Sequence, residues 1–308
     1  MQIPANGVRM PVELANSEFR RQVLSWRSTI GLMRRETSEL LVQATEVDTS
    51  AADAYEASLV PGLIALWAEL IVSEAKITEG MSILDVGCGT GIVARHAARR
   101  SGSAGRVVGM DIDQGMLGAA KSVSIKEGLS IDYQYGSACE LPFDSGAFDA
   151  LLCLQGLQYF PDPLRALREF RRVLKPRSVL AIVTWSELES CKGWWALVSA
   201  LERRGIDASA ARKPFALSSA DEIRSLCARA GFEDISVHAE QRVSNFRSAN
   251  HFVAAMLQGA PSTRLALEQV PKGEWPDFIS EVEDLLARWQ TASGLAFPTQ
   301  CNVVTARR

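Results

Sequence analysis

The sequence predicts an α/β protein built on a doubly wound, mostly parallel sheet. Short runs of β-branched and aliphatic residues alternate with helical patterns between residues 83 and 184, which is typical of βαβ units. A glycine-rich turn, GCGTG at residues 87–91, joins the first of these strands to the first helix. The chain has 308 residues, 47% of them hydrophobic, and is therefore long enough for one large core with an elaboration.

The elements follow one another in a regular order. Strands are expected at residues 83–86, 106–110, 131–135, 148–154 and 179–184, with helices at residues 92–100, 114–126 and 163–174. A helix at 218–230, with Ser218 or Ser219 as its N-cap and Gly231 at its C-cap, leads to strands at 235–241 and 302–306. The pattern therefore contains seven strands.

Three segments do not follow this alternation of strands and helices. Residues 1–48 show apolar residues at helical spacing among arginines, and we interpret them as an N-terminal helical extension. The domain proper then spans residues 49–308 and begins with an apolar helix at 60–75, with Pro61 near its start. Residues 186–217 and 244–293 are interpreted as cap-like insertions that form a lid or substrate wall; packing against the sheet edge is the alternative.

Composition narrows the class of partner. A net charge of -3 argues against a protein that coats nucleic acid, and no apolar run approaches the ~20 residues that span a bilayer. The six cysteines form no C-x-x-C pair and the three histidines are dispersed, so free thiols are expected and a metal site is not. With no secretory signal, we expect a cytoplasmic protein without nucleic-acid or membrane partners; a homodimer is left open.

The glycine turn indicates which ligand it binds. Gly87, Gly89 and Gly91 give G-x-G-x-G, whereas a dinucleotide site requires a glycine where this chain has Ile92. Asp85, at the end of the strand, would repel a pyrophosphate but attract an ammonium or sulfonium group. Asp111 lies twenty residues beyond Gly91, where an acid accepts hydrogen bonds from ribose hydroxyls. These observations favour a cationic nucleoside that carries an amino acid.

Four ordered segments carry a resemblance to a known family. ILDVGCGTG, VVGMDID, ELPFDSGAFDALLCLQGLQYFPDP and LREFRRVLKP resemble the successive signature segments of class I S-adenosylmethionine-dependent methyltransferases, in the small-molecule branch of the ubiquinone and menaquinone C-methylases. The resemblance covers residues 50–185 most strongly. It implies a Rossmann-like, seven-stranded sheet, S-adenosyl-L-methionine as methyl donor, and S-adenosyl-L-homocysteine as product.

The resemblance also implies roles for individual residues. It assigns the methionine and ribose portions to the loop and nearby residues: Asp85, Gly87, Cys88, Gly89, Gly91 and, on the ribose hydroxyls, Asp111. It assigns the adenine to Ile112, Met116, Ser137, Ala138 and Cys139, and the region of the sulfonium to Leu154 and Gln155, with Tyr55 as a cover. Relatives commonly have an acid at the position of Ser137 and Gly-Gly at the position of Arg177-Ser178, so adenine selectivity rests on a hydroxyl here.

Methyl transfer needs alignment more than a catalytic group, and a base only for a poor nucleophile. We assign Gln158, Tyr159 and Trp194 to the acceptor site, with core packing as the alternative, and consider Tyr159 and His251 as candidate bases. The chain lacks the [N/D]-P-P-[Y/F] element after the fourth strand, which favours a small-molecule acceptor such as a quinone, polyketide or other secondary metabolite. The alternatives are an RNA or protein methyltransferase that docks through the basic N-terminal helix, and a catalytically silent cofactor-binding module.

Overall fold

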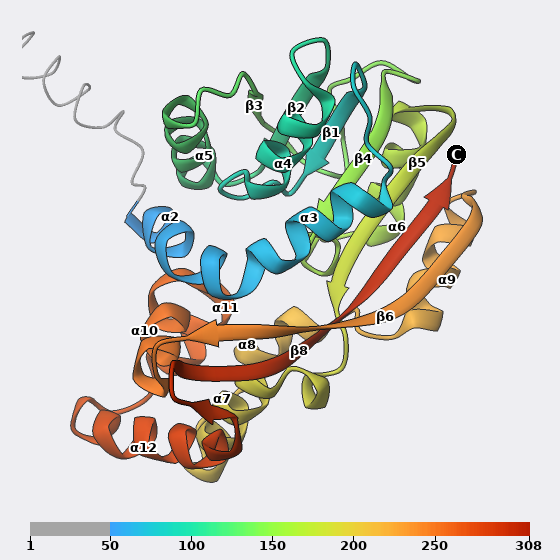
Figure 1. The fold of residues 1–308 in the computed structure, drawn as a ribbon. Helices are drawn as coiled ribbons and strands as arrows, with labels where there is room; N and C mark the ends of the chain where they lie inside the picture. Colours follow the sequence, from blue (N-terminus) through green and yellow to red (C-terminus); the bar gives the residue numbers. More distant parts are fainter. Residues whose placement is uncertain (1–49) are drawn as a thin grey trace, which may run out of the picture. The chain divides into compact units, whose positions relative to one another are not determined.

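A central mixed sheet organises the computed structural model, which describes residues 50–308 (Figure 1). In spatial order its strands run β3-β2-β1-β4-β5-β8-β6, with the short β7 paired to β8. The strands from β3 to β5 are parallel, and β8 runs antiparallel to both of its neighbours. The predicted doubly wound α/β fold is confirmed, with one further two-residue strand among the described residues. The strands are β1 (Ser82–Val86), β2 (Arg106–Asp111), β3 (Asp132–Tyr135), β4 (Phe148–Leu154), β5 (Leu174–Trp185), β6 (Glu233–Phe246), β7 (Gln290–Thr291) and β8 (Gly294–Arg307).

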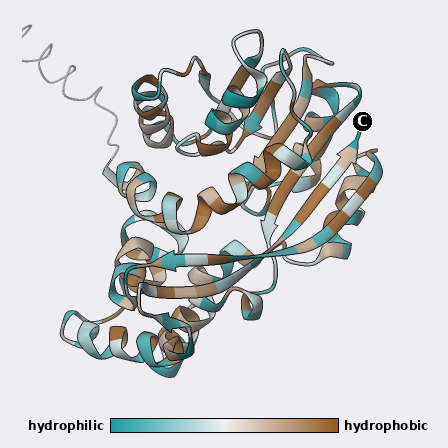
Figure 2. Ribbon diagram, viewed as in Figure 1, coloured by the Kyte–Doolittle hydropathy of each residue, from teal (hydrophilic) through white to brown (hydrophobic). Residues whose placement is uncertain are grey.

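Helices cover both faces of the sheet and give it two separate cores. Alternate residues of β4 show the division, since Leu152 packs on one face and Leu151 on the other, and both are fully buried. Figure 2 shows the central strands β4 and β5 mostly in the colours of hydrophobic residues. The core of the first face includes residues of α3 (Ala65–Glu74), α4 (Ile92–Ser101), α5 (Gln114–Lys126), α7 (Lys192–Arg203), α10 (Ala249–Gly259), α11 (Pro261–Leu267) and α12 (Trp275–Leu285), and that of the second includes residues of α6 (Pro163–Val173) and α9 (Ala220–Arg229).

Several helices begin where the sequence places a capping side chain. Ser219 accepts from the backbone N–H of Glu222 at the start of α9, which confirms one of the two predicted caps. Asp113, Asp162 and Ser248 cap α5, α6 and α10 in the same way. These local contacts fix the starts of the helices, and the observed bounds of α5, α6 and α9 differ little from the predicted ones.

The helix before β1 starts earlier than predicted. It comprises α2 (Ser50–Ala54), a π-helical segment η1 (Tyr55–Ile64) and α3, so Pro61 lies inside the helix and not at its start. Proline lacks an N–H and its ring crowds an α-helical turn, and the segment around Pro61 is π-helical. The backbone N–H of Ala65 accordingly donates to Val60, five residues earlier.

The same continuous helix, Ser50–Glu74, is long and apolar enough by composition to cross a membrane, with 44% of its most apolar window buried. Buried core helices meet this criterion as well. Trp67, Ala68 and Ile71 are fully buried against the sheet, so packing accounts for its apolar face.

The two C-terminal strands are much longer than predicted. β6 and β8 continue past the end of β5 as a two-stranded ribbon, paired from Gln241 and Gln300 to Phe246 and Leu295 (Figure 1). Pro298 is tolerated in β8 because the strand has only β6 as a partner at that point. This ribbon leads to the region of α7, α10, α11 and α12.

The two segments expected as insertions are largely helical. Residues 186–217 form η3 (Leu188–Ser190), α7, α8 (Ser209–Arg212) and η4 (Lys213–Phe215). Residues beyond β6 form α10, α11, η5 (Lys272–Glu274), α12 and η6 (Ala287–Trp289). Their role as a cap over an acceptor stays a prediction. The N-terminal extension expected at residues 1–48, with its basic face, lies outside the described residues.

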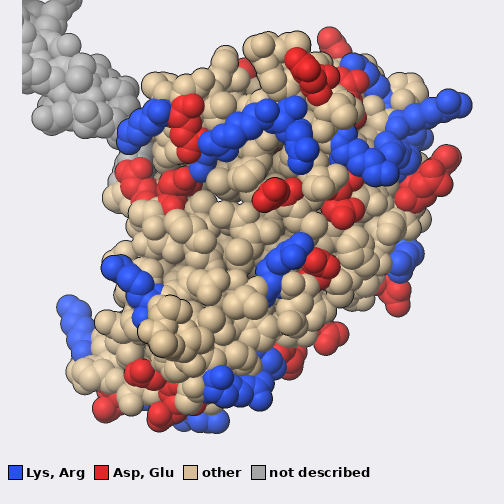
Figure 3. All heavy atoms as spheres, in the orientation of Figure 1, with Lys and Arg blue, Asp and Glu red and all other residues tan. Residues whose placement is uncertain are grey.

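On the face of the molecule in Figure 3, lysines and arginines lie among acidic side chains. Neutral side chains occupy much of the area between the charged regions at the two ends of this view.

Candidate functional site

The site forms at the carboxyl ends of β1, β2 and β4. The chain winds from β1 toward β3 in one direction and from β4 toward β5 in the other, so β1 and β4 flank a topological switch point. Open α/β sheets bind ligands in the crevice at this point. The glycine loop follows β1 there, and backbone N–H groups of Gly87 and Cys88 donate to the carbonyl of Met110 in β2.

The three glycines of the loop are required for different reasons. All three have positive φ, which favours glycine over any residue with a Cβ. A Cβ on Gly91 would lie 2.2 Å from the hydroxyl of Tyr133, whose ring passes beneath the loop and whose hydroxyl bonds with Ser124. A Cβ on Gly89 would meet nothing within 4 Å. Gly91 therefore accommodates a tyrosine, and only Gly89 leaves open space in which a ligand can approach the backbone.

Asp111 fixes the loop from the end of β2. One carboxylate oxygen accepts from the backbone N–H of Gly89 at 2.8 Å, and the other accepts from Asp113 at 2.9 Å. Burial raises the pKa of Asp111, and these two hydrogen bonds oppose that rise. Each oxygen keeps a second lone pair with which to accept a ligand hydroxyl.

Asp85 is the other acid of the site, and it is 1% exposed. One of its oxygens accepts from the backbone N–H of Ala94 in α4 at 3.0 Å, whereas Oδ1 has no hydrogen-bond partner among the described residues. Burial raises the pKa of Asp85 to about 8, the Ala94 bond lowers it, and the charge of Asp111 raises it further. A buried carboxylate without a full set of partners is costly unless a cation or donor completes it.

Two neighbouring clefts contain most of the residues predicted to bind the cofactor. The larger, of about 270 Å³, lies over the ends of β2 and β4 and contains Gly87, Asp111, Ile112, Ser137, Ala138, Cys139 and Gln155. The smaller is lined by Tyr55, Asp85, Gly87, Cys88, Gly89 and Leu154. Gly87 lines both clefts, so one elongated ligand is able to occupy them together.

Two predicted cofactor residues line neither cleft. Gly91 is turned to Tyr133, as described above. Met116 lies in the first turn of α5, where its backbone N–H donates to the capping carboxylate of Asp113. Ser137 does line the larger cleft, but its hydroxyl accepts from the backbone N–H of Cys139 and so closes a turn. The Ser137 hydroxyl therefore uses one acceptor lone pair within the turn and keeps its O–H to donate to a ligand.

The turn after β4 provides the polar groups next to the clefts. Gln155 has a φ of 56°, a left-handed conformation that is unusual without glycine, and its amide donates to the sulfur of Cys301. Gln158 donates to the side chain of Gln155 at 2.9 Å and is 7% exposed, and its own Oε1 has no hydrogen-bond partner within residues 50–308. Gln158 thus buttresses Gln155, which lines the cleft.

Tyr159, in the turn after β4, lines the larger cleft, and Tyr55, at the start of η1, lines the smaller one. Burial raises the pKa of Tyr159 to about 12, against a side-chain hydrogen bond with Ser262 of α11, although the residue as a whole is 42% exposed. Burial also raises the pKa of Tyr55, and the nearby Tyr159, Glu56 and Asp111 add to the rise. Both phenols are therefore protonated near neutral pH and are suited to donate hydrogen bonds, which argues against Tyr159 as a base.

Trp194 and His251 lie away from these two clefts. The indole N–H of Trp194 donates to Thr263, and its ring packs against Trp185 and Phe215 in the core, so the core-packing alternative describes its position. His251 lines a separate groove of about 330 Å³ that shares no lining residue with either cleft. Its Nδ1 accepts from the backbone of Arg247, and burial followed by the charge of Arg247 lowers the pKa of His251. This position gives His251 no support as the base.

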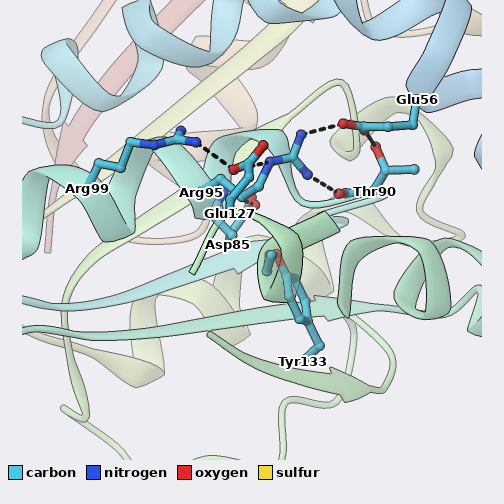
Figure 4. Close-up of polar contacts among 9 residues, drawn as sticks. Glu56, Asp85, Thr90, Arg95, Arg99, Glu127 and Tyr133 are labelled. Carbon is cyan, nitrogen blue, oxygen red and sulfur yellow. Dashed lines mark hydrogen bonds and ion pairs between the residues drawn. The ribbon is translucent and has the colours of Figure 1, made fainter. Parts of the chain in front are cut away.

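The glycine loop also contacts a network of charged side chains that the sequence analysis did not predict. Glu56 of η1, Thr90 of the loop and Arg95 of α4 contact one another, and Arg95 also approaches Glu127 (Figure 4). Glu56 lies 34 residues before Thr90, so no local spacing connects them. Within residues 50–308, no group of three or more His, Cys, Asp or Glu side chains is placed to hold a metal ion.

Comparisons with known proteins agree with this geometry. Residues 84–182 match the methyltransferase domain family. A 2-phytyl-1,4-naphthoquinone methyltransferase of Synechococcus elongatus is 38% identical over 124 residues, which are 40% of this chain and 53% of that protein. A demethylmenaquinone methyltransferase of Staphylococcus aureus is 35% identical over 124 residues, or 40% and 50%. The ubiquinone/menaquinone biosynthesis C-methyltransferase UbiE of Bordetella parapertussis is 33% identical over 149 residues, or 47% and 58%. The matched region thus spans about half the length of these relatives.

Solved structures share the fold at low sequence identity. The YcgJ protein of Bacillus subtilis superposes with a TM-score of 0.52 at 16% identity and covers 78% of this chain and 97% of its own. Phosphoethanolamine N-methyltransferase 2 of Haemonchus contortus, solved with S-adenosyl-L-methionine, superposes with a TM-score of 0.55 at 20% identity and covers 86% and 58%.

Proposed function

We propose that this chain, whose residues 84–182 match the methyltransferase domain family, is a class I S-adenosylmethionine-dependent methyltransferase that transfers a methyl group to a small, apolar, quinone-like acceptor. One observation carries the proposal: the buried side chain of Asp85 and the half-buried side chain of Asp111 flank a loop whose middle glycine faces open space. Such a site disfavours a pyrophosphate and suits a ligand that brings a positive charge together with ribose hydroxyls.

The residues of the two clefts fit the proposed cofactor. Asp85 would hold the ammonium end through its unpartnered oxygen, and Asp111 would accept from the ribose hydroxyls with its free lone pairs. Ile112 and Ala138 offer apolar contacts to the adenine in the larger cleft. When bound, S-adenosylmethionine supplies a methyl group activated by its sulfonium sulfur.

The acceptor side requires alignment and exclusion of water from the chain's own residues. The acceptor would lie beyond the adenine, on the side of the larger cleft formed by the turn after β4, where Phe160 and Pro161 add apolar surface for a flat, apolar molecule. Tyr159 and Gln155 are placed to orient the oxygens of such a molecule by hydrogen bonds. An electron-rich hydroquinone ring carbon is itself nucleophilic, so this reaction does not depend on a strong base in the protein.

The names of the relatives support the acceptor class. Those of Synechococcus and Staphylococcus are named for a naphthoquinone and a demethylmenaquinone, and that of Bordetella for ubiquinone and menaquinone biosynthesis. Their identity extends over 40–47% of this chain, so the acceptor is proposed from these names together with the apolar residues that follow β4 in the larger cleft.

The test incubates the purified protein with S-adenosylmethionine and a reduced 1,4-naphthoquinone, and detects a product heavier by one methylene group by mass spectrometry. We expect S-adenosylhomocysteine and methylated naphthoquinol in equal amounts. Failure of S-adenosylhomocysteine to bind in calorimetry would refute the cofactor assignment. Cofactor binding without product would refute the quinone-like acceptor alone.

A further inference from the structure

The helix at the smaller cleft is tied to the glycine loop through a single carboxylate. Tyr55 and Ile64 of η1 line this cleft opposite Gly89 and Thr90. Between them in the sequence, Glu56 accepts from the Thr90 hydroxyl with one carboxylate oxygen and from Arg95 with the other, at 2.5 Å (Figure 4). Glu56 therefore joins a wall of the cleft to its floor.

Arg95 makes this link an electrostatic one. Its side chain is 2% exposed, and a buried guanidinium is tolerated only when it is paired and hydrogen-bonded. It donates to the backbone carbonyl of Thr90 at 2.6 Å, and its Nε lies 3.3 Å from the carboxylate of Glu127 at the end of α5. Arg95 thus contacts the helix η1, the glycine loop and the end of α5 at the same time.

The two carboxylates around Arg95 differ in what they hold. Glu56 connects Arg95 to η1 and to the loop. Glu127 connects it only to the end of α5 and to Arg99, whose side chain is 48% exposed. Both neutralise the same buried cation, so comparison of the two separates the clamp on the loop from a general contribution to stability.

We propose that Glu56 is a positioning residue that clamps the helix at the cofactor cleft onto the glycine loop, so that helix and loop respond to the cofactor as one unit. The inference rests on the proposed function. When the clamp is intact, η1 and its residue Tyr55 are already ordered at the cleft before the cofactor binds. The free energy of binding then includes no entropic cost for ordering the helix. When the clamp is broken, the loop still folds but binding must order η1.

Calorimetry with S-adenosylhomocysteine tests the clamp in the full chain. We expect Glu56→Gln and Thr90→Val to weaken affinity at least tenfold, since each removes one contact of the clamp at nearly constant volume. Thr90→Ser keeps the hydroxyl and should restore most of the affinity lost in Thr90→Val. Glu127→Gln is the matched control and should bind within about twofold of the wild-type protein. Equal losses in Glu56→Gln and Glu127→Gln, or no loss in Glu56→Gln, would overturn the clamp.

Amide hydrogen exchange gives a readout that a purely stabilising role would not change. In the wild-type protein, S-adenosylhomocysteine should protect residues 55–64 and 87–91 together, whereas in Glu56→Gln protection should reach only the loop. If the wild-type protein binds no S-adenosylhomocysteine, the proposed function fails and the clamp is judged on the free protein. Glu56→Gln must then accelerate exchange in residues 55–64 more than Glu127→Gln does, and exchange unchanged in η1 would refute the clamp.

Discussion

Substitution of Asp85 by asparagine tests whether ionisation of this buried side chain lowers the free energy of unfolding of the protein. Asp85 is 1% exposed, and its one hydrogen bond within the described chain, from Ala94, leaves Oδ1 without a partner. Burial raises the pKa of this group to about 8, and the nearby Asp111 adds to the rise. Asparagine keeps the shape and removes the charge, so the variant isolates the cost of ionising this position.

The direction of the effect follows from proton linkage. In the unfolded chain Asp85 ionises near pH 3.9, whereas in the folded protein it ionises near pH 8. Between these values the folded state holds a proton that the unfolded state has lost, so the wild-type protein loses stability as the pH rises. The slope approaches about 1.4 kcal/mol per pH unit, and the whole window corresponds to about 6 kcal/mol as an upper limit.

The assay is chemical denaturation of both proteins at intervals from pH 4 to pH 9. The free energy of unfolding of Asp85→Asn minus that of the wild-type protein should increase with pH up to about 8 and then level off. A difference that does not vary with pH would refute the argument. The same variant should bind S-adenosylhomocysteine at least tenfold more weakly, because the ligand's ammonium group loses a charged acceptor.

Other substitutions test the loop and the acceptor side. Asp111→Ala should weaken S-adenosylhomocysteine binding at least tenfold in calorimetry, since it removes a charged acceptor and releases the backbone N–H of Gly89; unchanged affinity would contradict the assigned site. Gly89→Ala should cost only about 1–2 kcal/mol of stability yet abolish binding, because its Cβ points into open space at positive φ. Gly91→Ala should instead cost about 2–4 kcal/mol in denaturation, with part of the loss recovered in combination with Tyr133→Phe, which removes the hydroxyl 2.2 Å from the new Cβ. Tyr159→Phe should lower the rate of methyl transfer without shifting its pH profile, and a lost ionisation would restore Tyr159 as a base.

Much of the fold was predictable because its signals are local. The strand before the glycine turn, the capped helix α5 and the acid at the end of β2 each depend on residues within one or two turns of one another. The lengths of β6 and β8 were not predictable in this way. Their outer halves pair with each other and, at the end of β8, with the two-residue β7, and neither strand shows its partner in its own sequence.

In the candidate site, too, the features set by neighbouring residues were predictable and those set by distant residues were not. By itself, the sequence determined that a strand, a glycine turn and two acids meet at the carboxyl edge of a parallel sheet, since strand period and turn chemistry are properties of adjacent residues. The tertiary structure alone decided that Tyr133 fills the space beside Gly91, that His251 faces a separate groove, and that Glu56 reaches Thr90 and Arg95. These contacts join residues far apart in the chain, and only packing of the helices on the sheet brings such side chains together.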